Sequence, residues 1–297
     1  MVVNDSTSRS RGMEATAIAE ASAHTARAVE LAIPAVPCEA LDERLGFAVP
    51  FRPAPESLSK SLVDWKMDAD DMPILRYLYR HFRPRRHLEF GTWEGAGVVA
   101  CLEECDATVW TLNLPDGECW PDGKYAYPRK LERGAVVPAG VTSRPAADHV
   151  VVQSDAGWFV GRLYREKGLG HRVCQVYCDS RDWDTSSYPD GFFDSVLVDG
   201  GHTEEIVASD TRKAMRLVRP GGLVLWHDFC PDADVEAKCA STQGVRRAIA
   251  ASWRWIEDAL QDAFWIKPSW ILVGIKRSGP DKRVRSARDL DASEGGS

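Results

Sequence analysis

Short apolar runs alternate with segments that repeat apolar residues at helical spacing through the middle of the chain. The runs with the length and composition of buried strands are 86–90, 107–112, 172–177, 193–198, 223–226, 263–266 and 270–275. The segments with helical periodicity are 96–104, 158–165, 203–218 and 243–256. Because strands that alternate with helices form a mainly parallel sheet covered on both faces, the pattern predicts an α/β fold with a doubly wound, seven-stranded sheet. The last two strands, joined at Lys267-Pro268-Ser269, predict an antiparallel hairpin at the edge of the sheet.

The same pattern divides the chain into four parts, which are 1–38, 39–85, 86–276 and 277–297. The first part contains an alanine-rich stretch and predicts a flexible or helical N-terminal arm, a candidate contact for a homo-oligomer. The second part predicts a helical extension, in which Pro73 divides a long helical repeat into two helices. The third part holds the alternating strands and helices. The fourth is charged, has almost no large apolar residues and predicts a disordered tail.

A long insertion, 115–155, interrupts the alternation with several prolines and no apolar periodicity. A structureless segment of this length is uncommon in a compact domain unless it forms a lid or a binding loop. The insertion follows a predicted strand, which places it at the carboxyl edge of the sheet, where open α/β folds bind ligands. A disordered insertion without a role is the alternative.

Composition excludes several classes of protein. The chain has 297 residues, of which 44% are hydrophobic, and a formal net charge of -7, so it can bury a core but lacks the basic surface of a nucleic-acid-binding protein. No apolar run approaches the ~18 residues needed to span a bilayer, and residues 1–12 lack the apolar core of a secretory signal. We therefore expect a cytoplasmic protein that binds neither membrane nor nucleic acid. Its eight cysteines include no C-x-x-C pair, which favours reduced thiols over disulfides or a zinc site.

The first strand of the sheet runs directly into a glycine-spaced turn and a helix. Gly91, Gly95 and Gly97 follow the pattern G-x-x-x-G-x-G, which is neither the G-x-G-x-x-G of dinucleotide binding nor a phosphate loop. Glycines let the backbone approach a ligand closely, and the helix that follows directs its positive N-terminal end toward the same space. With the preceding acid, Glu89, this geometry suits a nucleoside-containing cofactor. By itself, the pattern is equally typical of an ordinary strand-to-helix turn.

Two later consecutive strands end in polar side chains. These side chains are Asp199 and His202 after the first strand, and His227 and Asp228 after the second. Because the carboxyl ends of parallel strands meet at one edge of a sheet, the four side chains should face the same cleft as Gly91. A single acid at such a place is often a helix cap and a single histidine is often a core residue, but four together indicate a site.

Several motifs occur in a fixed order, namely Cys178-Asp179-Ser180, Asp199-Gly200-Gly201-His202, Pro220-Gly221-Gly222 and Trp226-His227-Asp228. With these motifs the chain resembles the class I S-adenosylmethionine-dependent methyltransferases, and within them the macrocin-type O-methyltransferases and cephalosporin-hydroxylase-like proteins. The resemblance covers residues 86–276 apart from the insertion. It implies a Rossmann-like fold, S-adenosylmethionine as the cofactor, and methyl transfer to a hydroxyl of a small molecule such as a sugar or a phenolic natural product.

The resemblance also implies a role for each residue that matches a family motif. Glu89 would engage the methionyl amine of the cofactor through water, and Asp179 with Ser180 would lie near the adenine amine. Asn113 stands where the family has an acid for the ribose hydroxyls, so this contact would be weaker or shared with Asp116. The predicted cofactor-binding residues are Glu89, Gly91, Thr92, Gly95, Gly97, Asn113, Asp179, Ser180 and Asp199.

The macrocin-like members of the family use a divalent cation held by acids, together with a histidine base. Asp199 and Asp228 match the metal-binding acids and His202 matches the base, so the predicted catalytic residues are His202 and Asp199. His227 stands where a second acid is common. Because Mg²⁺ prefers oxygen ligands and imidazole suits later transition metals, a site of Asp199, Asp228 and His227 leaves metal dependence open.

Among the aromatic residues, Trp93 and Trp120 are nominated for the cleft, where a flat side chain can stack on the acceptor or pack beside the cofactor. Two alternative functions remain. The first is a nucleotide-dependent oxidoreductase of doubly wound fold, against which the missing G-x-G-x-x-G counts. The second is a methyltransferase-fold binding protein without catalysis, which Asn113 and His227 keep open.

Overall fold

A computed structural model describes residues 31–114, 129–130, 136–137 and 160–278. The chain divides into two compact units, Met1–Ala32 and Ile33–Ser297, and the described fold is that of the second unit. Residues 1–30 of the predicted N-terminal arm, residues 279–297 of the predicted tail and most of the insertion, with Asp116 and Trp120, lie outside the described residues. The last part of the predicted arm, 35–37, forms strand β1.

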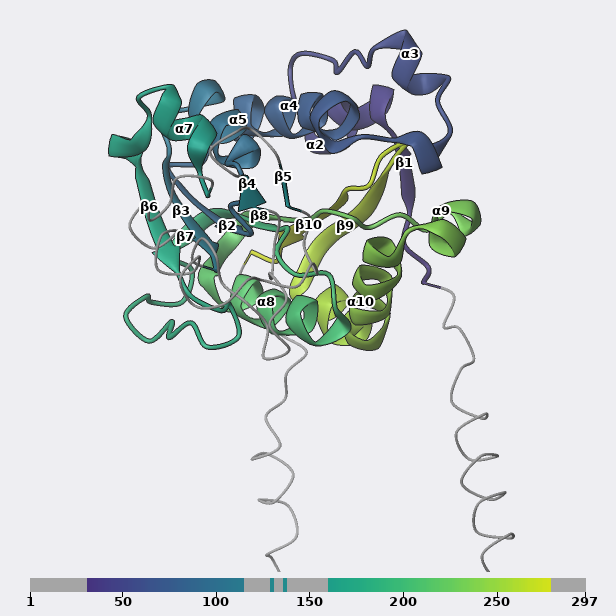
Figure 1. Cartoon of the computed structure of the whole chain (residues 1–297). Coiled ribbons are helices and arrows are strands. Elements are labelled where there is room, and N and C mark those ends of the chain that lie inside the picture. Colours follow the sequence, from purple (N-terminus) through teal and green to yellow (C-terminus); the bar gives the residue numbers. More distant parts are fainter. Residues whose placement is uncertain (1–30, 115–128, 131–135, 138–159, 279–297) are drawn as a thin grey trace, which may run out of the picture. The chain divides into compact units, whose positions relative to one another are not determined.

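One mainly parallel sheet of eight strands organises this unit, in the order β1-β9-β10-β8-β7-β2-β3-β6 (Figure 1). The strands are β1 (Ala35–Pro37), β2 (Arg86–Phe90), β3 (Thr108–Asn113), β6 (Val173–Tyr177), β7 (Phe193–Val198), β8 (Val218–Trp226), β9 (Leu260–Lys267) and β10 (Leu272–Lys276). Strand β10 runs antiparallel to both of its neighbours, and every other pair in this sheet is parallel. The predicted doubly wound α/β fold with an antiparallel hairpin is therefore confirmed.

The sheet has one strand more than the sequence predicts. Strand β1 pairs in parallel with β9, with Val36 opposite Ile266, and the carbonyl of Pro34 accepts a hydrogen bond from the amide of Trp265 at 2.9 Å. The hairpin of β9 and β10 consequently lies inside the sheet, and β1 forms its edge. A segment of three residues that follows one proline and ends in another shows no strand pattern of its own. Its pairing depends on a partner strand at the other end of the chain, which explains why the sequence did not reveal it.

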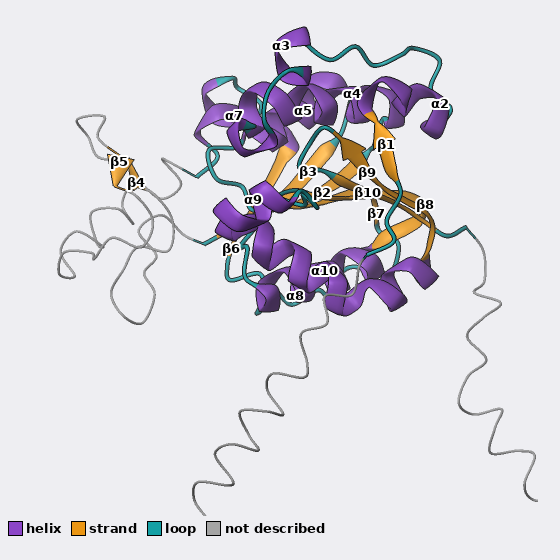
Figure 2. Cartoon of the chain, turned by 90° about the vertical axis from the view of Figure 1, so that its right-hand side faces the viewer, coloured by secondary structure: helices purple, strands orange, loops and turns teal. Residues whose placement is uncertain are grey.

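Helices cover both faces of the sheet, with α2, α4, α5 and α7 on one face and α8 and α10 on the other (Figures 1 and 2). The helices are α2 (Leu41–Leu45), α3 (Pro55–Leu58), α4 (Met72–Phe82), α5 (Ala96–Glu104), α7 (Arg162–Glu166), α8 (Glu204–Leu217), α9 (Ala233–Lys238) and α10 (Ala240–Ala259). The shorter elements are the 3₁₀ turns η1 (Cys38–Ala40), η2 (Leu62–Asp64) and η4 (Gly170–Arg172), the π-helical turn η3 (Met67–Asp71), and the antiparallel pair β4 (Arg129–Lys130) and β5 (Val136–Val137). Within the described parts of the chain, none of the helices is both long and apolar enough to cross a membrane.

The ends of the helices follow from local chemistry. Pro73 lies in the first turn of α4, where its missing N–H costs no helical hydrogen bond, and α4 follows directly on the π-helical turn η3. At the start of α8, the hydroxyl of Thr203 accepts a hydrogen bond from the amide of Ile206 at 3.4 Å. Glu204 and Glu205 add negative charge to the same first turn, where the helix dipole favours it.

A buried polar network connects α4 to the centre of the sheet. His87 on β2 is fully buried, with its Nε2 3.2 Å from the hydroxyl oxygen of Tyr79 on α4 and its Nδ1 2.7 Å from Oγ of Ser195 on β7. Burial lowers the pKa of His87 to about 3, because the apolar surroundings disfavour the charged imidazolium. The ring is therefore neutral at physiological pH.

Acidification should destabilise the fold through this histidine. His87 titrates near 6.5 in the unfolded chain and near 3 in the folded one, so between these values the unfolded state binds the extra proton. We expect the wild type to have a higher unfolding free energy than His87→Asn at neutral pH. This difference should shrink by up to about 1.4 kcal/mol per pH unit as the pH falls below the pKa of the unfolded state. Urea unfolding across this pH range measures the difference. Parallel pH dependences for the two proteins would contradict the assignment.

Candidate active site

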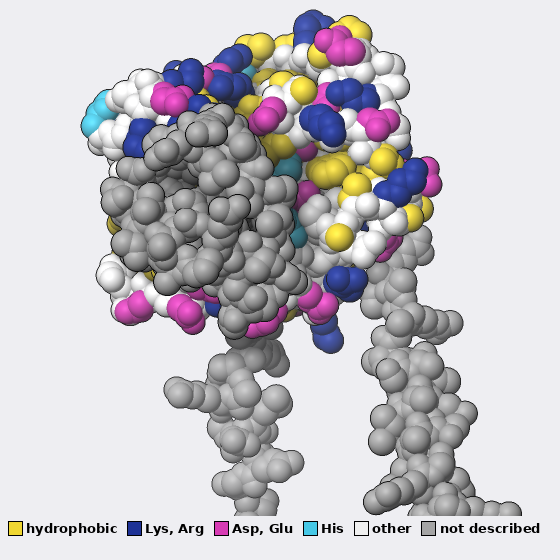
Figure 3. Space-filling view, in the orientation of Figure 1, with side chains coloured by type: hydrophobic (Ala, Val, Ile, Leu, Met, Phe, Trp, Pro, Cys, Tyr) yellow, Lys and Arg dark blue, Asp and Glu magenta, His cyan; other side chains and the backbone are white. Residues whose placement is uncertain are grey.

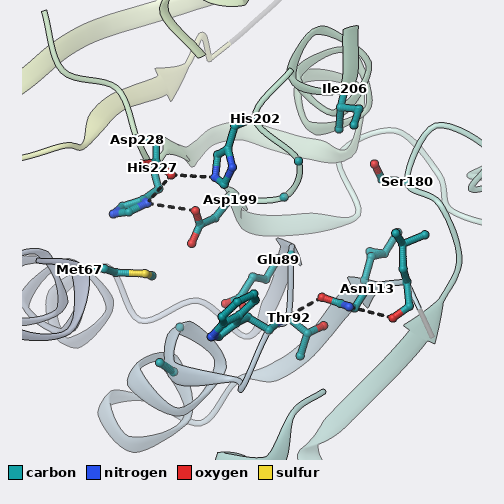
Figure 4. Close-up of a pocket in the computed structure, with 18 of the residues that line it drawn as sticks. Met67, Glu89, Thr92, Asn113, Ser180, Asp199, His202, Ile206, His227 and Asp228 are labelled. Atoms are coloured by element: carbon teal, nitrogen blue, oxygen red, sulfur yellow. Dashed lines mark hydrogen bonds and ion pairs between the residues drawn. The ribbon is translucent and has the colours of Figure 1, made fainter. Parts of the chain in front are cut away.

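A cavity of about 630 Å³ lies at the carboxyl ends of β2, β3, β6, β7 and β8 (Figure 4). On the face shown in Figure 3, histidine and acidic side chains gather in a hollow beside hydrophobic ones. Open α/β sheets bind ligands at this edge. The predicted residues that line the cavity are Glu89, Gly91, Thr92, Trp93, Gly97, Asn113, Asp179, Ser180, Asp199, His202, His227 and Asp228.

The glycine turn fits tightly against its neighbours. Gly91 has a φ of +93°, and a Cβ at this position would lie 2.0 Å from the carbonyl oxygen of Asp199. A Cβ on Gly97 would lie 2.5 Å from Oε2 of Glu89. Gly95 also has a left-handed backbone, but it begins α5 and packs against α7 instead of lining the cavity. Of the three predicted cofactor-binding glycines, Gly95 therefore has a structural position.

Glu89 lies between the two ends of the cavity and has an unsatisfied oxygen (Figure 4). The residue is only 2% exposed, and its Oε2 has no hydrogen-bond partner among the described residues. Burial, and the nearby charge of Asp199, raise the pKa of Glu89 well above its usual range. A buried polar atom without a partner costs free energy, so a ligand that donates a hydrogen bond to Oε2 would stabilise the site.

Asn113 supports the glycine turn from the neighbouring strand. Its Oδ1 accepts a hydrogen bond from the backbone amide of Trp93 at 3.0 Å, and its Nδ2 donates to the carbonyl of Leu114 at 2.8 Å. The first bond holds Trp93 at a φ of 48°, a conformation that is uncommon outside glycine. Thr92, in the same turn, shares a hydrogen bond of 2.7 Å with the hydroxyl of Thr111. An acid in place of Asn113 could not donate the second bond, which gives the amide a structural purpose.

Ser180 lies at the end of the cavity away from the two histidines (Figure 4). Next to it, Asp179 accepts hydrogen bonds from both the backbone amide and the guanidinium of Arg181, the shortest at 2.7 Å. The bonds to Arg181 lower the pKa of Asp179, so its carboxylate stays charged. The predicted adenine end of the cavity therefore combines a hydroxyl with an acid that is already paired.

The ends of β7 and β8 bring His202 and Asp228 together. Nε2 of His202 lies 2.8 Å from Oδ2 of Asp228, whose Oδ1 accepts a hydrogen bond from the hydroxyl of Ser241 at 3.0 Å. Burial opposes the charged form of His202, but the hydrogen bond to Asp228 and its charge outweigh burial and raise the pKa of His202. The next residue, Thr203, provides the N-cap of α8, so the side chain of His202 is not needed for capping.

Carboxylates enclose His227, which is only 5% exposed. Its Nδ1 lies 3.0 Å from Oδ1 of Asp199 and 3.3 Å from Oδ2 of Asp228, and its Nε2 lies 3.1 Å from Oδ2 of Asp71. Despite burial, the charges of Asp199 and Asp228 raise the pKa of His227 well above its usual range, so both ring nitrogens donate. His227 was predicted as a metal ligand, and in this arrangement both of its nitrogens face carboxylates. The donor atoms that lie within 4.8 Å of one another belong instead to Asp199, His202 and Asp228.

Asp71 is a site residue that sequence reasoning missed. It lies in η3, is fully buried, and accepts hydrogen bonds at Oδ1 from Nε1 of Trp65 at 2.7 Å and from the amide of Trp270 at 3.1 Å. Through His227 it joins the N-terminal helical extension to the strand ends. An acid just before a helix that starts with proline is typical of a helix start, so only its place in an apolar repeat hinted at burial. Further cavity residues outside the predicted site include Met67, Asp68, Cys178, Ile206 and Trp270.

The part of the chain that forms most of this cavity matches a known protein family. Residues 88–229 match a family model described as a methyltransferase domain. No curated protein matches the chain. Residues 88–229 therefore form a methyltransferase domain, with the motif order of the class I S-adenosylmethionine-dependent enzymes that the sequence resembles. The match counts against the oxidoreductase alternative.

Several solved structures are similar to the chain at low identity. A putative O-methyltransferase from Klebsiella pneumoniae is 17% identical with a TM-score of 0.42, and the similarity covers 81% of this chain and 98% of that one. The SAH-bound Podospora anserina methyltransferase PaMTH1 is 14% identical with a TM-score of 0.45, covering 94% and 99%. The O-methyltransferase TomG from Streptomyces achromogenes, in complex with SAM, is 18% identical with a TM-score of 0.40, covering 81% and 97%. Similarities at this level carry no argument about the substrate of this chain.

The tight fit at Gly91 predicts a large cost for a side chain there. Gly91→Ala would place Cβ 2.0 Å from a backbone oxygen, whereas Gly46→Ala, also at a left-handed φ, would meet no atom within 4 Å. We expect Gly46→Ala to lower the unfolding free energy by about 1–2 kcal/mol and Gly91→Ala to lower it by at least about 2 kcal/mol more. Urea unfolding of the two variants measures the difference. Equal losses would show that the turn at Gly91 relaxes freely.

Proposed function

We propose that the chain is an S-adenosylmethionine-dependent O-methyltransferase that acts on a hydroxyl of a small molecule such as a sugar or a phenol. One observation carries the proposal. A single cavity at the edge of a methyltransferase domain holds both the buried Glu89, whose Oε2 has no partner in the described part of the chain, and an accessible histidine, His202, paired with Asp228. The first suits a cofactor with hydrogen-bond donors, and the second suits removal of a proton from an acceptor.

The residues around the glycine turn fit this cofactor. Glycine at positions 91 and 97 lets the turn lie closer to Asp199 and Glu89 than a Cβ would allow. The cavity volume of about 630 Å³ lies within the range of roughly 300–1,000 Å³ typical of small-molecule sites. Glu89 would bind the ammonium of the methionyl part, Asn113 the ribose, and Asp179 with Ser180 the adenine. When bound, S-adenosylmethionine supplies a methyl group on a positively charged sulfur.

His202 would take the proton from the acceptor hydroxyl. Asp228 binds Nε2 of His202 and fixes the ring, so Nδ1 is the atom left to accept a proton. The His202 side chain is 41% exposed, which allows an acceptor to reach it. Asp199 faces the same space and would orient the acceptor. A general base contributes about 10²- to 10⁴-fold in rate, whereas orientation of the reactants can contribute as much as ~7–11 kcal/mol.

Replacement of His202 tests this role. We expect His202→Ala to lower kcat by about 10²- to 10⁴-fold and to leave the affinity for S-adenosylmethionine unchanged, because His202 makes none of the proposed cofactor contacts. His171→Ala, which removes an exposed histidine in η4 outside the cavity, is the matched control. Methyl transfer to candidate sugars and phenols gives kcat, and isothermal titration with S-adenosylmethionine and with NAD gives cofactor affinity.

Each outcome of that experiment has a distinct meaning. Failure to bind S-adenosylmethionine would overturn the proposed function. Normal turnover by His202→Ala would remove His202 as the base. Cofactor binding without turnover on any acceptor would favour the alternative of a methyltransferase-fold binding protein.

The cluster of Asp199, His202 and Asp228 also fits a divalent cation. Two carboxylates and an imidazole suit Mn²⁺, Fe²⁺ or Zn²⁺ better than Mg²⁺, which prefers oxygen ligands. An ion held there would polarise the acceptor oxygen and lower its pKa. It would also compete for the nitrogen with which His202 binds Asp228.

We expect methyl transfer to proceed without added metal, because His227 and His202 already hydrogen-bond the carboxylates of Asp199 and Asp228. Activity after dialysis against EDTA, with and without added Mn²⁺ or Mg²⁺, checks this expectation. Retained activity supports His202 as the base. A loss of activity that Mn²⁺ restores would assign the cluster to a metal instead.

A further inference from the structure

Negative charge predominates around the cavity. Among the described residues that line it, none is Lys or Arg, and the acidic residues are Asp68, Glu89, Asp179, Asp199 and Asp228, of which Glu89 is the one whose raised pKa favours the neutral form. Within the same set, the side chains that can carry positive charge are the two histidines. A ligand that enters this cavity therefore meets more negative than positive groups.

Part of this charge is neutralised by nearby groups. Arg181 pairs with Asp179 at 2.7 Å, and His227 lies between the carboxylates of the two strand ends. Asp68 is different, because it is exposed and no hydrogen bond or ion pair joins its side chain to another described residue. Oε2 of Glu89 is also unpartnered within that part of the chain. The cavity thus keeps one unpaired carboxyl beside the glycine turn and another on η3.

Asp68 belongs to a wall that the proposed cofactor contacts leave unused. This acceptor wall consists of Met67 and Asp68 from η3 and Trp270 from the β9–β10 turn. Met67 points into the cavity below His227 and to the side of Asp199 (Figure 4). Trp270 is fixed in place because its backbone amide and its Nε1 each donate a hydrogen bond at 3.1 Å. The wall therefore offers a flexible thioether and a rigid indole next to an unpaired carboxylate.

We propose that the acceptor is a neutral or amine-bearing hydroxyl compound with an apolar face, and that the site rejects anions such as phosphate esters, carboxylates and coenzyme A thioesters. This inference rests on the proposed methyltransferase function. An anion beside Asp68 and the strand-end carboxylates would meet like charge, and water screens this charge least at the buried Asp228. An ammonium group would instead pair with Asp68, while the apolar face of the acceptor packs against Met67 and Trp270.

Three catechols that share a ring and differ in charge test this preference. They are 3,4-dihydroxyphenethylamine, which is cationic, 4-methylcatechol, which is neutral, and 3,4-dihydroxyphenylacetate, which is anionic. Isothermal titration of the protein saturated with S-adenosylhomocysteine measures their binding independently of turnover. We expect the cationic compound to bind best and the anionic one at least about tenfold more weakly, with a smaller difference at high salt.

Two matched variants separate the local charge from the overall charge. Asp68→Asn and Asp106→Asn each remove one exposed carboxylate, but Asp106 precedes β3 at the edge of the sheet opposite the cavity. We expect Asp68→Asn to reduce the preference for the cationic over the neutral catechol about threefold, and Asp106→Asn to leave it unchanged. Equal effects of the two variants would overturn the role of Asp68.

The outcomes distinguish this inference from the proposed function. Catechols that bind in the expected order but receive no methyl group would support the charge preference and remove the activity. Methyl transfer to the anionic catechol with equal or better affinity would support the activity and overturn the charge preference. Failure of all three compounds to bind would also overturn the charge preference.

Discussion

One buried imidazole holds the site together, because carboxylates from three parts of the chain share it. Asp71 comes from the N-terminal extension, Asp199 follows β7, and Asp228 is the next residue after His227 itself. Three carboxylates so close together would repel one another in a buried setting, and a donor on each ring nitrogen offsets that repulsion. Loss of one member would leave buried charge without compensation, so the four residues depend on one another.

This interaction makes the N-terminal extension part of the active site. The same carboxylate of Asp71 binds His227, the indole of Trp65 and the backbone of Trp270, so it fixes η3 and the β9–β10 turn against the strand ends. The backbone is strained at Asp228, where the carboxylates and histidines meet, because a φ of 56° is unusual for a residue with a side chain. Strain of this kind persists only where the surroundings hold it in place, and here two histidines and Ser241 do so.

Much of the fold was predictable because its central strands, β2, β7 and β8, contain short apolar runs that are buried along most of their length. The polar residues at the strand ends were predictable too, since parallel topology brings them to one edge. Contacts between distant segments were not. Asp71 and His227 are 156 residues apart, and nothing in the local sequence of either indicates the other. His202 and His227 look alike in the sequence. The structure shows that His202 is accessible, whereas His227 is buried and contacts three carboxylates. Gly95 likewise resembles Gly91 and Gly97 in the sequence, and the structure shows that it packs against α7 instead of lining the cavity.

The methyltransferase domain at 88–229 and the acceptor wall come from different stretches of the chain. Met67 and Asp68 precede the domain, and Trp270 follows it. Substitutions in the wall can therefore alter which molecules enter while every methyltransferase motif stays intact. Two proteins that share this domain can differ in the molecules they modify, and resemblance within the domain alone does not transfer a substrate from one to the other.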